Sequence, residues 1–185
     1  TSIYSLNGGS GGTITVNAVN DYIVPTGADD FNNGQSLTAD ATYPSADYQL
    51  SVKANLVSSA ADDYNQLFTR YSSQALNGYY AVHLSDNVAT DPTIRKGASA
   101  TTETVLVTHD NSNGLIFKEG DTVIFEAIGS DIAVFNATAG AARGGAECGV
   151  LYVSNADVSS AGKAGLGFGA FWVDVRGDTT ATEQR

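Results

Sequence analysis

The sequence has one cysteine, no methionine, three prolines and few cationic side chains. Because one thiol cannot close an intrachain bridge, Cys148 excludes a disulfide framework. Nine Lys and Arg residues stand against 20 acidic ones, which gives a formal net charge of -11. Nucleic-acid binding needs clustered cations, so this balance argues against a nucleic-acid partner. Anionic membrane surfaces are disfavoured for the same reason.

Long apolar runs are also missing. No run approaches the roughly 20 residues that a membrane helix requires, and the first residues, TSIYSLNGGSGG, lack the basic start and apolar stretch of a signal peptide. We therefore expect no membrane insertion. With 185 residues, a chain can bury about 70% of the surface that its unfolded form exposes. We expect one folded domain whose core needs no metal or disulfide.

Strand and turn residues are abundant. The chain has 20 Gly, 9 Tyr and 7 Phe, whereas Leu, Glu and Lys in helical spacing are hard to find, and this composition is typical of β proteins. About ten short apolar or alternating runs recur between turn clusters, at 13–19, 47–57, 64–72, 78–85, 92–97, 102–109, 121–129, 131–137, 149–155 and 165–177. The pattern predicts an all-β fold, and the chain length favours a two-sheet antiparallel jelly-roll sandwich.

The clearest hairpin is DTVIFEAIGSDIAVFNA, where Gly129 and Ser130 separate two apolar runs. Glycine supplies the positive φ that a type II′ turn needs at its first central position. Alternation places Val123, Phe125 and Ala127 on one face of the first strand, with Ile124 and Ile128 on the other. We therefore expect this strand to be covered on both sides for part of its length.

The organisation is simple. Residues 1–36 are rich in Gly, Asn, Asp and Ser around a single strand run, so we predict an N-terminal arm or extra edge strand there. The main domain is predicted over residues 37–178, and the polar residues 179–185 are predicted to form a mobile tail.

Five motifs in order then resemble a known family. They are DYQLSVKANL, LFTRYSS, NGYYAVHL, EGDTVIFEAIGSDIAVFNATAG and AGKAGLGFGAFWVDV. Together they resemble the concanavalin A-like, laminin-G-like jelly-roll modules over roughly residues 37–178. The matching residues are Arg70, Gly78, Tyr79, Tyr80, Leu84, Gly120, Asp121, Gly129, Ser130, Ile132, Val134, Gly162, Gly165, Leu166, Gly167 and Asp174. The resemblance implies the fold, which hosts lectins, glycan hydrolases, lyases and structural modules alike.

A glucanase-type site is not supported by the acidic residues of EGDTVIFE. In the glucanases of this fold, three acids alternate along one strand, and a retaining enzyme needs two carboxylates about 5 Å apart. Glu119 and Asp121 have the required spacing, but Val123 or Ile124 stands at the third position. Glu126 has the opposite parity and would point to the other face. We interpret Glu119 to Asp121 as a turn that enters a strand.

A lyase-type site is the other enzymatic alternative. Jelly-roll lyases combine a Tyr and a His with a cation, and Tyr79, His83 and Arg70 could meet on one sheet, since Tyr79 and His83 share a face by alternation. A chain with a net charge of -11 would repel a polyanionic substrate, however. The sequence favours His83 as a packed or hydrogen-bonded sheet residue over a catalytic base.

Two binding features stay open. Trp172, Asp174 and Arg176 alternate with apolar residues along the last predicted strand, and an exposed Trp beside polar groups is a platform for sugar stacking, with Tyr79 and Tyr80 as further candidates. The alternative, which the sequence favours, places Trp172 in the core.

The second feature is a calcium site. Laminin-G-like modules often carry calcium, and the loop around Asp110, Asn111 and Asn113 offers the oxygen ligands that this ion takes. Ser112 replaces one acid of the usual loop pattern, so the sequence favours solvated loops.

The preferred functional hypothesis is a non-catalytic structural or adhesion protein on an exposed assembly, most specifically a phage-type virion surface protein of the capsid decoration or fibre kind. Its partners would be proteins of the virion or surface assembly, further copies of the chain in a homo-oligomer, and glycans. The expected location is the virion surface or the extracellular space. The alternative is a secreted carbohydrate-binding module that binds a neutral glycan, and a polysaccharide hydrolase or lyase comes third.

Overall fold

The computed structural model describes residues 4–7, 13–17, 22–26, 35–39, 44–53, 65–72, 76–84, 91–98, 103–113, 116–118, 120–138, 151–168 and 180–182. Over these ranges the chain is all β apart from one 3-10 turn, η2 (Asn111–Asn113), which confirms the predicted fold class. No helix in the described ranges has the length and apolarity to cross a membrane.

The strands are short and follow one another closely. They are β1 (Tyr4–Asn7), β2 (Thr13–Asn17), β3 (Tyr22–Thr26), β4 (Gln35–Ala39), β5 (Tyr48–Lys53), β6 (Asn65–Tyr71), β7 (Tyr80–Leu84), β8 (Thr93–Gly97), β9 (Glu103–Thr108), β10 (Thr122–Ile128), β11 (Asp131–Asn136), β12 (Leu151–Ser154), β13 (Lys163–Phe168) and β14 (Thr180–Thr182).

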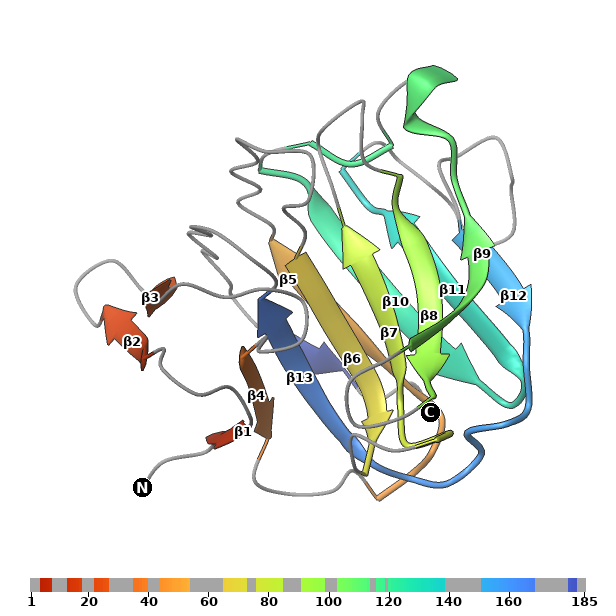
Figure 1. The fold of residues 1–185 in the computed structure, drawn as a ribbon, viewed down its shortest axis with the longest axis horizontal. Coiled ribbons are helices and arrows are strands. Elements are labelled where there is room, and N and C mark those ends of the chain that lie inside the picture. The colour runs from red at the N-terminus through yellow and green to blue at the C-terminus, as the bar shows by residue number, and fades with distance from the viewer. Residues whose placement is uncertain are drawn as a thin grey trace.

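Two antiparallel sheets form the sandwich (Figure 1). One has seven strands in the order β1-β4-β13-β6-β7-β8-β9, and the other has five in the order β12-β11-β10-β5-β14. The chain crosses from one sheet to the other, so that β13 lies between β4 and β6, and β5 lies beside β10. This arrangement confirms the predicted two-sheet jelly roll. A separate two-stranded sheet, β2 with β3, lies in the N-terminal part.

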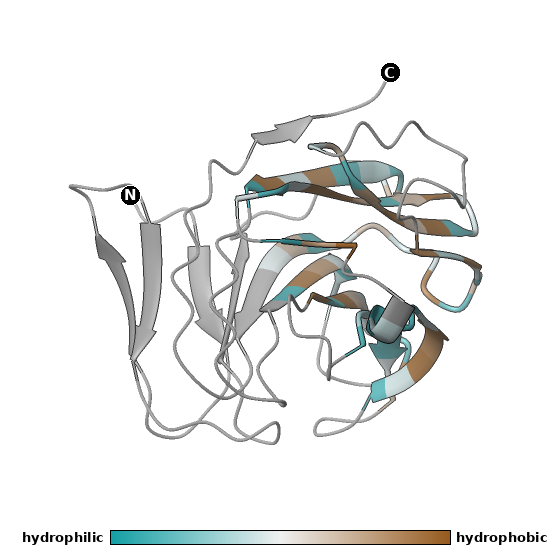
Figure 2. Cartoon of the chain, turned by 90° about the horizontal axis from the view of Figure 1, so that it is seen from above, coloured by the Kyte–Doolittle hydropathy of each residue, from teal (hydrophilic) through white to brown (hydrophobic). Residues whose placement is uncertain are grey.

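The hydrophobic core lies between the sheets. Figure 2 shows the sheets as two layers with hydrophobic residues on the strands of both. Residues on β10 illustrate the packing, because Val123, Phe125 and Ala127 are each 0% exposed while Ile124 and Ile128 on the other face are half-buried. The buried face and the half-buried face of β10 both agree with the predicted alternation. Across the interface the core continues with Leu67, Tyr80, Val82, Leu84 and Ile94 from the seven-stranded sheet.

The β10–β11 hairpin turns at Gly129 and Ser130, as predicted. Gly129 has a φ of 57°, whereas Ser130 is not among the described residues with positive φ. That combination is the one a type II′ turn requires. The Gly129 backbone N donates to Asp47 Oδ1 over 2.8 Å, which attaches the turn to the segment leading into β5.

The N-terminal residues contribute strands to the main sandwich. β4 pairs with β13, and β1 pairs with β4 to form an edge of the seven-stranded sheet. The domain boundaries proposed from the sequence, after residues 36 and 178, stay predictions.

Candidate functional site

The seven-stranded sheet carries a polar cluster on the face that points away from the core. Leu67, Val82 and Ile94 are neighbours across β6, β7 and β8, and all three face the core. The next residues along each strand point the opposite way. One such row across the outer face joins Gln66, His83 and Thr93, and the adjacent row joins Phe68, Ala81 and Arg95.

At the centre of this outer-face cluster lies Glu103, the first residue of β9. The Tyr79 hydroxyl donates a hydrogen bond to Glu103 Oε1 over 2.9 Å, and His83 Nε2 lies 2.7 Å from Glu103 Oε2. Arg95 Nη1 lies 3.9 Å from the same oxygen. The side-chain amide of Gln66 lies 2.6 Å from His83 Nε2. The β9 carboxylate is therefore contacted from β7, from β8 and from the residue that precedes β7, and β6 joins the cluster through His83.

The surroundings shift the pKa values of His83, Glu103 and Tyr79. Burial lowers the pKa of His83 below its ordinary 6.5, against the opposing effect of Glu103. Burial alone would raise the pKa of Glu103, but contact with His83, Tyr79 and Arg95 outweighs it and lowers that pKa. Burial and the nearby Glu103 raise the pKa of Tyr79. At neutral pH we therefore expect an ionised Glu103, which accepts a hydrogen bond from the Tyr79 hydroxyl, and a neutral His83.

This arrangement stabilises a carboxylate and holds strands together. A carboxyl group with a lowered pKa is a weak general base near neutral pH. The side chains of His83 and Glu103 are only 2% and 5% exposed, so both are shielded from solvent. Beside them, Phe68, Tyr71 and Tyr79 form an aromatic group with ring centroids 5.3 to 5.9 Å apart. Tyr79 is 7% exposed, so its ring packs within the protein.

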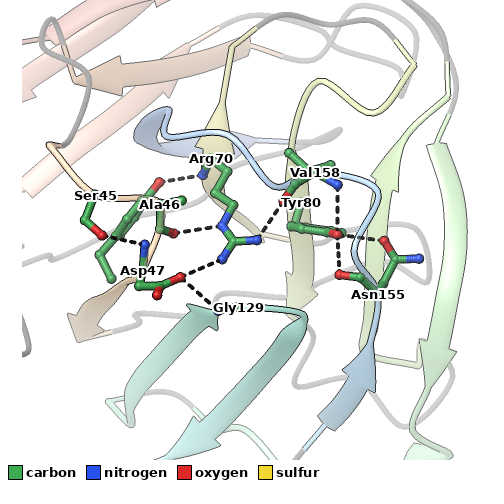
Figure 3. Close-up of polar contacts among 9 residues, drawn as sticks. Ser45, Ala46, Asp47, Arg70, Tyr80, Gly129, Asn155 and Val158 are labelled. Atoms are coloured by element: carbon green, nitrogen blue, oxygen red, sulfur yellow. Dashed lines mark hydrogen bonds and ion pairs between the residues drawn. The ribbon is translucent and has the colours of Figure 1, made fainter.

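Arg70 lies at the centre of a second polar network (Figure 3), and its side chain is buried, with 1% exposed. Its Nε donates to the carbonyl of Ala46 over 2.8 Å, and Nη1 donates to the carbonyl of Val158 over 2.6 Å. Its Nη2 lies 3.2 Å from Asp47 Oδ1, the atom that also accepts from Gly129. The guanidinium thus connects β6, the start of β5 and the segment between β12 and β13.

Tyr80 completes this network from the core side (Figure 3). Its hydroxyl lies 2.7 Å from the carbonyl and 2.6 Å from the side-chain oxygen of Asn155, and accepts from the backbone N of Val158 over 3.1 Å. Gly162 packs against the same region, because a Cβ there would lie 2.3 Å from the Arg70 carbonyl carbon. Arg70, Tyr80 and Gly162, which carried part of the family resemblance, stabilise the fold at this point.

The structure brings together only some of the sequence-predicted binding residues. Tyr79 and His83 share the outer face, as alternation predicted, whereas Arg70 and Tyr80 are buried in the other network. The residue that sequence reasoning missed is Glu103, and its alternating run TETVLVT was the available signal. Trp172, Asp174 and Arg176 lie outside the described residues, as does Glu119.

The candidate calcium loop is held by one local hydrogen bond and by one to a residue 20 positions earlier in the chain. Asp110 Oδ1 accepts from the backbone N of Ser112 over 2.9 Å, and the backbone N of buried Asn111 donates to Asp91 Oδ1 over 2.9 Å. In the part of the chain that the structure describes, no three His, Cys, Asp or Glu side chains form a group that could hold a metal ion. A calcium site at Asp110, Asn111 and Asn113 stays a prediction.

Comparison with known proteins gives no matching family model and no matching curated protein. Solved structures do match. A carbohydrate-binding module, CBM66 from Bacillus subtilis, superposes with a TM-score of 0.65 at 12% identity, over 95% of this chain and 94% of that one. The chain has the concanavalin A-like lectin fold.

Two further lectin-type structures support this assignment of the fold. A legume lectin-like domain from Entamoeba histolytica gives a TM-score of 0.58 at 11% identity, covering 98% of this chain and 90% of that one. The CBM2 module of the evolved Dit of Lactobacillus casei BL23 phage J-1 gives 0.53 at 13% identity, covering 98% and 86%. At such identities the likeness establishes the fold, and function has to be argued from the site.

Proposed function

We propose that this chain is a non-catalytic glycan-binding module on an exposed surface. The observation that carries the proposal is the nearly end-to-end superposition with a carbohydrate-binding module, over 95% of this chain and 94% of that one. The lectin-like domain and the phage Dit module match over similar shares of their lengths. Two carbohydrate-binding modules and one lectin-like domain therefore have this sandwich fold. Small-molecule sites on such folds are grafted on a rigid scaffold.

The acidic residues near the β10 strand support a binding role over catalysis. Asp121 Oδ2 accepts from the backbone N of Lys118 over 2.8 Å and from Asn136 Nδ2 over 2.6 Å, so its carboxylate holds the turn that enters β10. Glu126 is 5% exposed and lies on the face opposite to the core residue Phe125, as its parity predicted. Asp121 thus has a structural role and Glu126 points to the other face of the strand, whereas a retaining glycosidase needs two carboxylates about 5 Å apart.

The expected ligand is a neutral glycan. A protein with a net charge of -11 repels polyanionic chains at long range, whereas hydroxyl groups and C–H faces carry no net charge. Trp172, with Asp174 and Arg176 beside it in the sequence, is the binding surface proposed from the sequence.

A second candidate is a virion surface protein, and the match to the phage J-1 Dit module favours it. In this version the chain is a decoration or fibre protein, and residues 1–36 contact the shell or neighbouring copies. Attachment of this kind needs an interface of at least about 1,000 Å². A virion protein that binds glycans would satisfy both candidates.

One pair of measurements tests the two proposals. A glycan array is probed with the full chain, and the particle mass is measured by light scattering on the same sample. A monomer that binds neutral glycans supports the carbohydrate-binding module. A discrete oligomer that binds no glycan supports the structural virion protein and refutes glycan binding. A monomer without glycan binding contradicts both.

A further inference from the structure

An exposed tyrosine lies on the outer side of the five-stranded sheet. Tyr152 is 54% exposed, the largest exposed fraction among the aromatic side chains whose burial the structure describes. It belongs to β12, the edge strand, and pairs with Ala133 of β11. Its neighbour Leu151 is 2% exposed and faces the core, so alternation directs Tyr152 away from it. This surface is on the other sheet from the outer-face cluster of Glu103.

The tyrosine ring is held at its polar end. Its hydroxyl donates to Asp131 Oδ1 over 2.9 Å. Asp131 is exposed and pairs with Ser154, and the Ser154 hydroxyl lies 3.2 Å from the Ser130 hydroxyl. One exposed aromatic ring, one carboxylate and two hydroxyls therefore gather where the β10–β11 turn meets the end of β12.

The backbone under these groups is also fixed. The backbone N of Asn155 donates to the carbonyl of Ser130 over 2.7 Å, which joins the end of β12 to the hairpin turn. Asn155 in turn contacts the hydroxyl of Tyr80, a residue that is 0% exposed. A surface whose side chains and backbone are already ordered loses little conformational freedom when it binds.

These groups match the chemistry of a neutral sugar. The apolar C–H face of a pyranose packs on an aromatic ring, and sugar hydroxyls donate to carboxylate oxygens. Asp131 has a second oxygen, Oδ2, besides the one that accepts from Tyr152. A negatively charged sugar would be repelled by the same carboxylate.

We propose that Tyr152, Asp131 and Ser154 form a binding platform for one unit of a neutral glycan. The ring of Tyr152 stacks on the sugar, while Asp131 and Ser154 bind its hydroxyls. This inference rests on the proposed glycan-binding function and gives that function a location different from the Trp172 strand.

The test uses the full chain and a neutral glycan that the array identifies, with Kd measured by titration calorimetry. Tyr152→Ala should raise Kd by about tenfold or more, and Tyr152→Phe, which keeps the ring, by a smaller factor. Because the side chain is exposed, the melting temperature should change by no more than about 2 °C. Leu76→Ala is the matched control, since Leu76 is 65% exposed and lies in the turn before β7. Its Kd should not change.

The outcomes separate the platform from the proposed function. If the unmodified chain binds no neutral glycan, the function and the platform both fail. If the chain binds and Tyr152→Ala binds equally well, the platform is refuted while the function stands, and Trp172→Ala then tests the other location. If Tyr152→Ala and Tyr152→Phe lose binding to the same extent, each together with a large drop in melting temperature, the tyrosine supports the fold and the platform is again refuted.

Discussion

Replacing Arg70 distinguishes a residue that stabilises the fold from one that binds a ligand. Its side chain is 1% exposed, and two of its three contacts are to backbone carbonyls, of Ala46 and Val158. Arg70→Ala removes both donors and leaves the carbonyls without them. We expect a large loss of stability and no specific effect on glycan binding by the molecules that stay folded.

The magnitude follows from the individual contacts. A hydrogen bond to a charged group contributes about 1.5–3 kcal/mol, so the two carbonyl contacts together give about 3–6 kcal/mol. The ion pair adds little, because Asp47 is 53% exposed and exposed pairs contribute about 0–1 kcal/mol. Removal of a desolvated charge offsets part of the loss. We expect about 3–5 kcal/mol, which lowers the melting temperature of a chain of this size by about 6–20 °C.

The backbone of Arg70 supplies an internal comparison. Its φ is 52°, in the left-handed region that favours glycine. A left-handed backbone conformation destabilises a non-glycine residue by about 1–2 kcal/mol. Glycine avoids this cost but loses more conformational entropy on folding, which offsets part of its advantage. Arg70→Gly should therefore be more stable than Arg70→Ala by roughly 0.5–1 kcal/mol.

The assay is urea denaturation followed by tryptophan fluorescence or circular dichroism, with glycan titration under native conditions. Lys53→Ala is the control for loss of one positive charge, since Lys53 is exposed at the end of β5. The reasoning is refuted if Arg70→Ala unfolds at nearly the same urea concentration as the unmodified chain, and a specific loss of glycan binding would then make Arg70 a ligand residue.

Three further predictions concern stability. Burial lowers the pKa of His83 below its ordinary 6.5, so as the pH falls the imidazole is protonated in the unfolded chain before it is protonated in the folded one. The free energy of unfolding should therefore fall as the pH drops below about 6.5, by at most about 1.4 kcal/mol per pH unit. His83→Gln should flatten that dependence in urea titrations, and an unchanged pH dependence in this variant would refute the assignment. Gly162→Ala, whose new methyl would lie 2.3 Å from the Arg70 backbone, should lower the free energy of unfolding by about 3 kcal/mol or more. Gly129→Ala, with a φ of 57° and open space around the new methyl, should lower it by only about 1 kcal/mol. Similar losses in the two variants would contradict the close packing of Gly162. Tyr80→Phe should cost about 2–3 kcal/mol in the same assay, because Val158 and Asn155 lose a buried partner, and a change below about 0.5 kcal/mol would mean that these hydrogen bonds are dispensable.

Local patterns predicted most of the strands. Each of the ten predicted runs overlaps a strand of the structure, because alternation and turn residues are properties of neighbouring positions. The missed strands were β1, β3, β4 and β14. They are short, β3 contains Pro25, and β1 and β4 join the seven-stranded sheet only by pairing with distant residues. Composition gives no information on such pairing, so the N-terminal residues were expected to form only an arm or an edge strand.

The site was predictable only where strands are regular. Tyr79 and His83 share a face because alternation holds on that segment. On β6 the alternation fails, since Arg70 has a positive φ and the pairing with β13 shifts register between Lys163 and Gly165. As a result Tyr71, and not Arg70, packs beside Phe68 on the outer face. Glu103 was missed because its contacts depend on which strands are neighbours.

The measurement that tests the central claim most directly is a glycan array probed with the full chain. We predict saturable binding to neutral glycans that are recovered intact, with no binding to polyanionic ones. Absence of binding to any neutral glycan would contradict the proposed function, and recovery of a cleaved glycan would contradict its non-catalytic character.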